Sequence, residues 1–460
     1  MRNAELTARA DAVPLVGRGT LGLLAAAFVA VVGVAALDYY GSQSADVAVL
    51  PPLDPAELSP GFGPESFDAA MAAVNQDLEG RRYLLAREPD DWVRMEGVAR
   101  ALLTRARLTA SAEDFHEAGR LLAAGIEAAP YPSGPVMSRA GAALAIHDLP
   151  VVERALERLD ASVTPPNDGE AIQARAMRCE IAYERGDLKG AKALCAGGGG
   201  DDIGLLLRSA NMELASGNTA AAARHVEEAL RTPRQTPFQL ARLMLQRSAI
   251  ALATGDWEAA GEWARAADRI FPGYWLAQAF VAQSLALDGD VAGAEAAYRA
   301  IAERTDNPDV WGALVGIASE RGDEAARRAY LARAGAAWER RVALLPDTYA
   351  GHYAEYLAQT GAIDRALAIS GGDYAERPFL PVITGWAIVL DAAGRQREVL
   401  TVVERAEAAG FRSPTLLMFK SGALAALGRN GEAEEAREAA LAMNPKIEHP
   451  LQSYVHFRQD

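Results

Sequence analysis

The side chains with the greatest chemical reactivity in this 460-residue chain are its two cysteines, Cys179 and Cys195. They can form a disulfide if their Cα atoms come within about 7 Å of each other. Otherwise they stay reduced and behave as small buried hydrophobic side chains. Both alternatives are open until the elements that carry the two residues are placed.

The other residues that could do chemistry do not form a recognisable site. Four consecutive glycines at 197–200 lack the Lys-Ser or Lys-Thr that completes a phosphate-binding loop, so they indicate a flexible link. The histidines lack the spacing of zinc or catalytic motifs; they are His116, His147, His225, His352, His449 and His456. We therefore expect no enzymatic activity, no metal and no cofactor.

Glycine recurs along the chain with a period close to that of one helical hairpin. Each of these glycines follows an apolar, Ala-rich run and precedes a second amphipathic run, commonly with Asp or Asn next as an N-cap. Only glycine enters the left-handed turn between antiparallel helices without a steric cost. The predicted turn residues are Gly186, Gly217, Gly255, Gly289, Gly322, Gly361, Gly394 and Gly428, separated by 31, 38, 34, 33, 39, 33 and 34 residues.

Small residues follow these glycines at fixed offsets. Alanine stands five residues later in Ala191, Ala222, Ala260, Ala294, Ala366 and Ala433, and twelve later in Ala229, Ala267, Ala406 and Ala440. Proline ends the clearest copies seventeen residues after the glycine, at Pro272 and Pro445. With these offsets, and with Trp311 eleven residues before Gly322, the chain resembles the tetratricopeptide repeat, a 34-residue helix-turn-helix unit.

The resemblance covers about residues 91–445. Ala118 and Pro130 keep the family's offsets from a turn at Glu113, and His147 takes the next turn position. The family implies an all-α, right-handed solenoid of about ten helical hairpins.

Several positions depart from the regular pattern. The first two hairpins lack the turn glycine, and Arg327 replaces the small residue after Gly322. The longer intervals predict inserted loops before Gly255 and Gly361, and the short one predicts a trimmed hairpin before Gly217. We expect curvature to deviate at these places.

The hairpin around Gly186 fixes the register of the two cysteines. Cys179 lies opposite a residue near Ala191, so Cys195 is about one helical turn out of register. This favours two reduced, buried cysteines and leaves the disulfide as the alternative.

Residues 19–37 are uncharged and mostly apolar. At about 1.5 Å per residue they can cross a hydrocarbon core of roughly 30 Å. Arg2, Arg9 and Arg18 precede them, whereas residues 38–80 contain no Lys or Arg. The positive-inside rule then predicts a single-pass protein of the inner membrane, with its N-terminus in the cytoplasm and its repeats in the periplasm.

A cleaved signal peptide is the alternative for this segment, with Val34-Ala35-Ala36 as the small-residue site. After it, a proline-rich and acidic stretch predicts an extended tether, and a first helix is expected over Phe67–Arg87. The expected organisation is a cytoplasmic N-terminus (1–18), a transmembrane anchor (19–37), a tether (38–65), the helical repeats (66–445) and a C-terminal tail (446–460).

The net charge of −15 argues against nucleic acid as a partner, because that binding depends on Lys and Arg. In the family, the first helix of each pair lines a concave face that binds other proteins. The corresponding face of this chain offers a candidate partner-binding patch, for which a solvated helix face is the alternative: Arg208, Asn211, Arg242, Gln246, Gln278 and Gln283.

Two functional hypotheses follow. The favoured one is a non-catalytic, membrane-anchored scaffold or adaptor for protein–protein interactions in the periplasm, serving the assembly of envelope, polysaccharide or secretion machinery. The other is a soluble exported peptide-binding or chaperone-like module, released by cleavage of the N-terminal segment.

Overall fold

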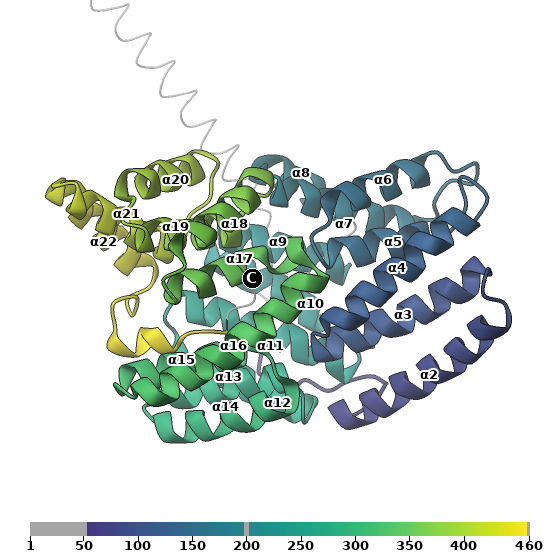
Figure 1. Cartoon of the computed structure of the whole chain (residues 1–460), viewed down its shortest axis with the longest axis horizontal. Helices are drawn as coiled ribbons and strands as arrows, with labels where there is room; N and C mark the ends of the chain where they lie inside the picture. The colour runs from purple at the N-terminus through teal and green to yellow at the C-terminus, as the bar shows by residue number, and fades with distance from the viewer. Residues whose placement is uncertain (1–52, 197–201, 458–460) are drawn as a thin grey trace, which may run out of the picture. The chain divides into compact units, whose positions relative to one another are not determined.

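The computed structural model describes residues 53–196 and 202–457. The chain divides at Asp54–Pro55, and the architecture below is that of the unit beginning at Pro55. Apart from one short 3-10 helix, η1 (Pro450–Tyr454), the regular elements of the described residues are all α-helices (Figure 1). The all-α class predicted from the sequence is confirmed for this part of the chain.

The predicted anchor (19–37), its alternative cleavage site and the glycine link at 197–200 lie outside the described residues. Among the helices of residues 53–196 and 202–457, none combines the length and the apolar character that crossing a membrane requires. The end of the predicted tether is described, and there the Gly61 amide donates a hydrogen bond to the carbonyl oxygen of Gln235 at 2.8 Å. This part of the tether is therefore attached to the repeats.

Helix α2 (Phe67–Arg87) covers the residues predicted for a first helix, and ten hairpins follow it in the described residues. Consecutive hairpins pack against one another along the chain. The pairs are α3 (Trp92–Thr109) with α4 (Ala112–Ala128), α5 (Val136–Leu144) with α6 (Leu149–Asp160), α7 (Asp168–Glu184) with α8 (Leu188–Ala196), α9 (Ile203–Ala215) with α10 (Thr219–Arg231), α11 (Pro237–Ala253) with α12 (Trp257–Ile270), α13 (Trp275–Leu287) with α14 (Val291–Thr305), α15 (Pro308–Glu320) with α16 (Glu324–Leu344), α17 (Pro346–Gln359) with α18 (Ile363–Glu376), α19 (Leu380–Ala392) with α20 (Gln396–Ala408), and α21 (Pro414–Ala426) with α22 (Asn430–Met443).

The turns have the geometry that the glycine ladder predicts. All eight ladder glycines have φ between 67° and 93°, a region that side chains other than that of glycine rarely enter. Aspartates that follow four of them cap the second helix: Asp187 accepts from the Gly190 amide at 2.8 Å, Asp256 from Ala259 at 3.1 Å, Asp290 from Gly293 at 2.9 Å and Asp323 from Ala326 at 3.0 Å.

The alanines at both offsets lie in the helix–helix contacts. Those five residues after a turn glycine are at most 6% exposed, and those twelve residues after it are at most 3% exposed. Arg327, which breaks the pattern, stays partly exposed, and α16 buries no residue before Ala334. A small side chain is therefore what allows the second helix to approach the first.

The first turn was placed wrongly by the sequence. Ala110, with φ 56°, is the left-handed residue, and Ser111 caps α4, so the turn precedes Glu113. His147 does occupy a turn, with φ 59°. Neither turn contains glycine, so no residue in the sequence of the first hairpin marks where its turn lies.

The uneven intervals have mixed causes. The hairpin before Gly217 is trimmed as predicted, because α8 has only 9 residues. No inserted loop precedes Gly361; the extra residues extend α16 to 21 residues. Before Gly255, α11 reaches 17 residues and follows a link at 232–236.

Hairpins far apart in the sequence also pack together. One hydrophobic cluster joins residues of α7–α9 with residues of α19–α22. The ring of Tyr183 lies 5.5 Å from that of Phe379 and 6.1 Å from that of Phe411. Next to it, the Arg412 amide donates to the Ala215 carbonyl oxygen at 2.8 Å. The C-terminal hairpins are thus fixed against the middle of the array.

The first hairpins make a second set of distant contacts. The indole Nε1 of Trp275 donates to the carbonyl oxygen of Leu108 at 3.1 Å, and the Thr348 hydroxyl donates to that of Ile146 at 2.8 Å. In repeat proteins, each repeat normally contacts only the repeats next to it in the sequence. This array instead closes on itself at two places.

A buried ion cluster reinforces the closure. Arg377, which follows α18, pairs with Asp373 at 2.6 Å and lies 3.5 Å from Glu184 at the end of α7. His147 reaches the same Glu184 at 3.0 Å. Burial raises the pKa of Asp373, and the charge of Arg377 opposes that rise. Removing one member would leave a charge buried without compensation.

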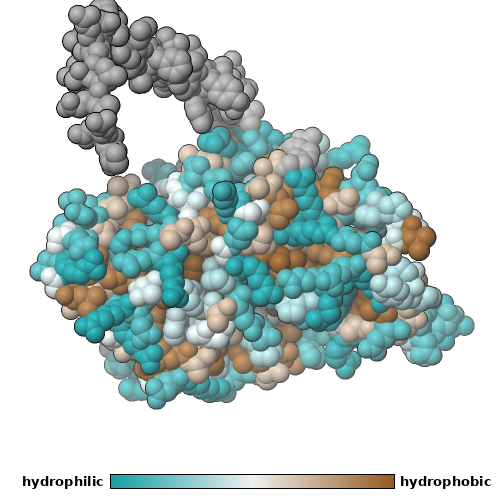
Figure 2. Space-filling view, turned by 90° about the horizontal axis from the view of Figure 1, so that it is seen from above, coloured by the Kyte–Doolittle hydropathy of each residue, from teal (hydrophilic) through white to brown (hydrophobic). Residues whose placement is uncertain are grey.

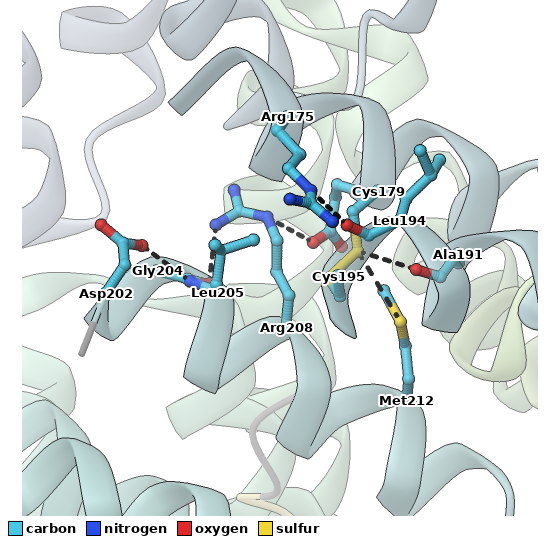
Figure 3. The surroundings of a disulfide bond; sticks show 11 residues. Arg175, Cys179, Ala191, Leu194, Cys195, Asp202, Gly204, Leu205, Arg208 and Met212 are labelled. Atoms are coloured by element: carbon cyan, nitrogen blue, oxygen red, sulfur yellow. Dashed lines mark hydrogen bonds and ion pairs between the residues drawn. A yellow bond between two sulfur atoms is a disulfide. The ribbon is translucent and has the colours of Figure 1, made fainter. Parts of the chain in front are cut away.

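Cys179 and Cys195 are joined by a disulfide, with Cα atoms 5.7 Å apart (Figure 3). The favoured expectation of two reduced cysteines is therefore wrong. Cys179 Sγ does lie 3.3 Å from the carbonyl oxygen of Ala191, the residue expected opposite it. Side chains on a helix lean toward its N-terminus, so Cys195, one turn beyond Ala191, can still reach Cys179.

Replacing both cysteines with alanine should lower the free energy of unfolding by about 3 kcal/mol, because the bond closes a loop with a sequence separation of 16 residues. Urea unfolding of the wild-type and double-variant chains without reductant measures this difference. Reductant should bring the wild-type curve to that of the variant. Equal stability of the two oxidised chains would contradict the prediction.

Candidate functional site

The six predicted partner-binding residues lie on the first helices of three consecutive hairpins, two on each helix. Arg208 and Asn211 belong to α9, Arg242 and Gln246 to α11, and Gln278 and Gln283 to α13. The structure gives most of them partners within the chain.

Asn211 and Gln246 bind each other. Gln246 is only 6% exposed, and its Nε2 donates to Asn211 Oδ1 at 2.7 Å. A buried amide without a partner would cost free energy. This pair therefore connects α9 to α11.

Arg208 neutralises a carboxylate. Its Nε lies 3.0 Å from Glu180 Oε2 on α7, and both side chains are mostly buried. Burial raises the pKa of Glu180, and the charge of Arg208 opposes that rise. This buried ion pair indicates that Arg208 stabilises the packing of α9 against α7.

The two glutamines of α13 are also occupied. Gln278 Oε1 accepts from Arg304 Nη2 on α14 at 2.6 Å. Gln283, which is 1% exposed, binds the backbone of the C-terminal segment: its Oε1 accepts from the Phe457 amide at 2.7 Å. Sequence analysis placed that segment in a tail and gave it no role.

Arg242 differs from the other five. It is exposed and has no hydrogen bond or ion pair with any residue in the described ranges. Arg107 of α3 lies close enough for its charge to interact with that of Arg242. The Arg107 side chain is also exposed at the surface. The protein around its guanidinium nevertheless lowers the pKa of Arg107 by burial, and the positive charge of Arg242 lowers that pKa further. The two cations are thus near enough to act on each other electrostatically, and neither has an ion pair with a carboxylate of the described residues.

A cavity of about 440 Å³ is lined by residues of α2, α4, α13, α14 and α16 and by the last residue of α3. Three arginines and two acids line it, so its charge is slightly positive: Arg304, Arg340, Arg341, Glu113 and Asp306. Trp275, Thr109 and Ser111 contribute an aromatic face and two hydroxyl groups. Arg340 forms an ion pair with Asp306, so part of the positive charge that lines the cavity is already compensated.

The described residues contain no group of three or more His, Cys, Asp or Glu placed to hold a metal ion. On the face seen in Figure 2, hydrophobic residues show in small groups among hydrophilic ones. Polar and charged side chains are therefore the main features available for recognition on that face.

Two parts of this region were not predicted from the sequence. Arg107 was not considered because its hairpin lacked a turn glycine and was placed in the wrong register. The C-terminal segment carried a signal in its aromatic residues Tyr454 and Phe457, which are 8% and 6% exposed. Aromatic residues are uncommon in a free tail, because a free tail rarely buries its side chains.

No family model matches the chain, and no curated protein matches it. Similar solved structures include a tetratricopeptide repeat protein from Parabacteroides merdae ATCC 43184, with 13% identity and a TM-score of 0.34 over 55% of this chain and 98% of that one. Yeast Tom70 has 13% identity and a TM-score of 0.33 over 83% and 91% of the two chains. The Rap protein complexed with competence and sporulation factor has 11% identity and a TM-score of 0.41 over 68% and 97%. All these TM-scores are below 0.5, so the assignment of helical hairpins rests on the helices and turns described above.

Arg208→Ala should destabilise the chain by about 3 kcal/mol at pH 7, because it leaves the Glu180 carboxylate buried without its cation. The remaining carboxyl would have a folded-state pKa further above its unfolded value, so the loss should shrink as the pH falls and Glu180 takes up a proton. Urea unfolding at pH 7 and pH 5 tests both points. Adding Glu180→Gln should restore part of the stability; a loss that does not change with pH would contradict this account.

Proposed function

We propose that this chain is a non-catalytic scaffold that binds an acidic segment of a partner protein at Arg107 and Arg242. The observation that supports this function is that two arginines act on each other electrostatically and have no carboxylate partner among the described residues, in a chain whose net charge is −15. Like charges held close together repel each other, and surrounding protein reduces the screening by water. A bound carboxylate would remove that cost.

The neighbouring side chains suit such a ligand. Tyr274 precedes α13, is buried, and lies near enough to Arg242 that the positive charge acts on its hydroxyl group. Burial raises the pKa of Tyr274, so the hydroxyl stays protonated and can donate a hydrogen bond. An anionic partner would meet the two exposed guanidinium groups, with the buried Tyr274 beneath them.

Charge reversal at both arginines, Arg107→Glu with Arg242→Glu, should prevent partner capture. The tagged full chain would be cross-linked in its own cells, and the captured proteins quantified by mass spectrometry. At least one protein should fall tenfold or more with this variant, because the binding depends on attraction between opposite charges. The matched control, Arg224→Glu with Arg265→Glu, changes two exposed arginines of the second helices α10 and α12. Identical sets of captured proteins in both variants would contradict the proposal.

We propose further that the scaffold is held at the inner membrane by residues 19–37 and acts in the periplasm, in the assembly of envelope, polysaccharide or secretion machinery. The apolar segment and the arginines before it support the orientation. The disulfide supports an oxidising compartment, because such bonds are rare in the cytosol. Nucleic acid stays an unfavoured partner because of the chain's negative charge.

A soluble exported peptide-binding or chaperone-like module is the second candidate, and the sequence Val34-Ala35-Ala36 favours it. The two candidates differ in the mature N-terminus. For the anchored form, mass spectrometry should find peptides from residues 1–18, and the chain should stay in the membrane fraction after a high-salt wash. A mature chain that begins just after Ala36 and is recovered without membranes would support the second candidate instead.

A further inference from the structure

The C-terminal segment returns to the array after α22. In Figure 1 the yellow segment runs from α22 to the region of α15 and α13, and η1 contacts both of these helices. Near its start, the ammonium group of Lys446 lies 4.2 Å from the centre of the Trp257 ring, and the His449 ring meets the same indole at 5.0 Å. The segment therefore passes the start of α12 before it reaches α13 and α15, the first helices of two hairpins.

At the end of this path, one side chain binds the backbone of two residues. Gln283 Oε1 accepts from the amides of His456 at 2.6 Å and Phe457 at 2.7 Å, and Gln283 Nε2 donates to the carbonyl oxygen of Phe457 at 3.1 Å. The preceding residue, Val455, has extended backbone angles. These contacts use only main-chain atoms, so they would hold any extended segment.

The Phe457 side chain fills a pocket of aromatic rings. Its ring centre lies 6.1 Å from that of Phe280 and 5.8 Å from that of Tyr298, and Phe457 is only 6% exposed. Beside it, Gly316 admits the His456 ring, because a Cβ at that position would lie 2.6 Å from His456 Nε2. The pocket selects an aromatic side chain and allows a bulky residue before it.

The chain's own segment does not satisfy the whole site. Tyr298 is 2% exposed, and its hydroxyl has no hydrogen-bond partner among the described residues. A buried hydroxyl without a partner is unfavourable. A ligand that offered an acceptor to Tyr298 would fit the site better than residues 455–457 do.

We propose that the groove formed by Phe280, Gln283, Tyr298 and Gly316 is a docking site for an extended, aromatic peptide segment of a partner, and that residues 455–457 occupy it as an intramolecular competitor. A tethered segment has an effective concentration of about millimolar, so it excludes a weak ligand and yields to a tighter one. This site uses none of the residues of the Arg107–Arg242 pair. The two proposals can therefore fail separately.

The test uses a fluorescent peptide with the sequence of residues 450–460 and the full chain, with binding measured by anisotropy. Phe457→Ala removes the aromatic anchor of the intramolecular segment, so this chain should bind the peptide at least tenfold more tightly than the wild type. Phe62→Ala, which truncates a phenylalanine that is 60% exposed, should bind as weakly as the wild type. Adding Gln283→Leu to the Phe457→Ala chain should weaken binding at least tenfold.

Equal affinity of the wild-type and Phe457→Ala chains for the peptide would overturn the proposal. So would an affinity of the Phe457→Ala chain that stays the same after Gln283→Leu is added. A second measurement needs no variant that risks misfolding. Millimolar peptide should speed hydrogen exchange at the His456 and Phe457 amides of the wild-type chain, and a peptide with alanine in place of its phenylalanine should not. Unchanged exchange with the first peptide would also overturn the proposal.

Discussion

The packing of α19–α22 against α7–α9 is the interaction on which the rest of the structure depends. It brings Phe379 and Phe411 to Tyr183, and Arg412 to Ala215, although about two hundred residues of sequence separate them. In an open repeat array, stability is close to a sum of neighbouring contacts. Here the loss of one C-terminal hairpin would also expose the cluster that surrounds the disulfide hairpin, so distant repeats share one core.

Most of the predicted partner-binding patch is occupied by contacts within one hairpin, between neighbouring hairpins or with the C-terminal segment. Polar side chains that lose contact with water need partners inside the protein. Gln246 finds Asn211, Gln278 accepts from Arg304, and Gln283 binds the C-terminal segment. Arg107 and Arg242 are exceptions, and for that reason they carry the proposed function.

The sequence predicted what is local and missed what is distant. Helix pairs, turn glycines and buried alanines follow from short-range spacing, so residues such as Gly255 and Ala260 could be placed from the chain alone. The turn at Ala110 lacked a glycine and was assigned to Glu113. The Cys179–Cys195 bond depends on the direction in which the Cys195 side chain points, and residue spacing alone does not give that direction. Contacts such as Gln283 with Phe457 join residues separated by 174 positions, and no repeat period encodes them.

Hydrogen exchange at the Arg412 amide tests the closed arrangement most directly. This residue lies in the link between α20 and α21, outside any helix, and its only backbone acceptor in the described chain is the carbonyl oxygen of Ala215, 2.8 Å away. If the C-terminal hairpins pack against the middle of the array, the amide should exchange at least about a thousandfold more slowly than an exposed loop amide, because exchange requires the packed units to open. Exchange at the rate of a free loop would contradict closure of the array.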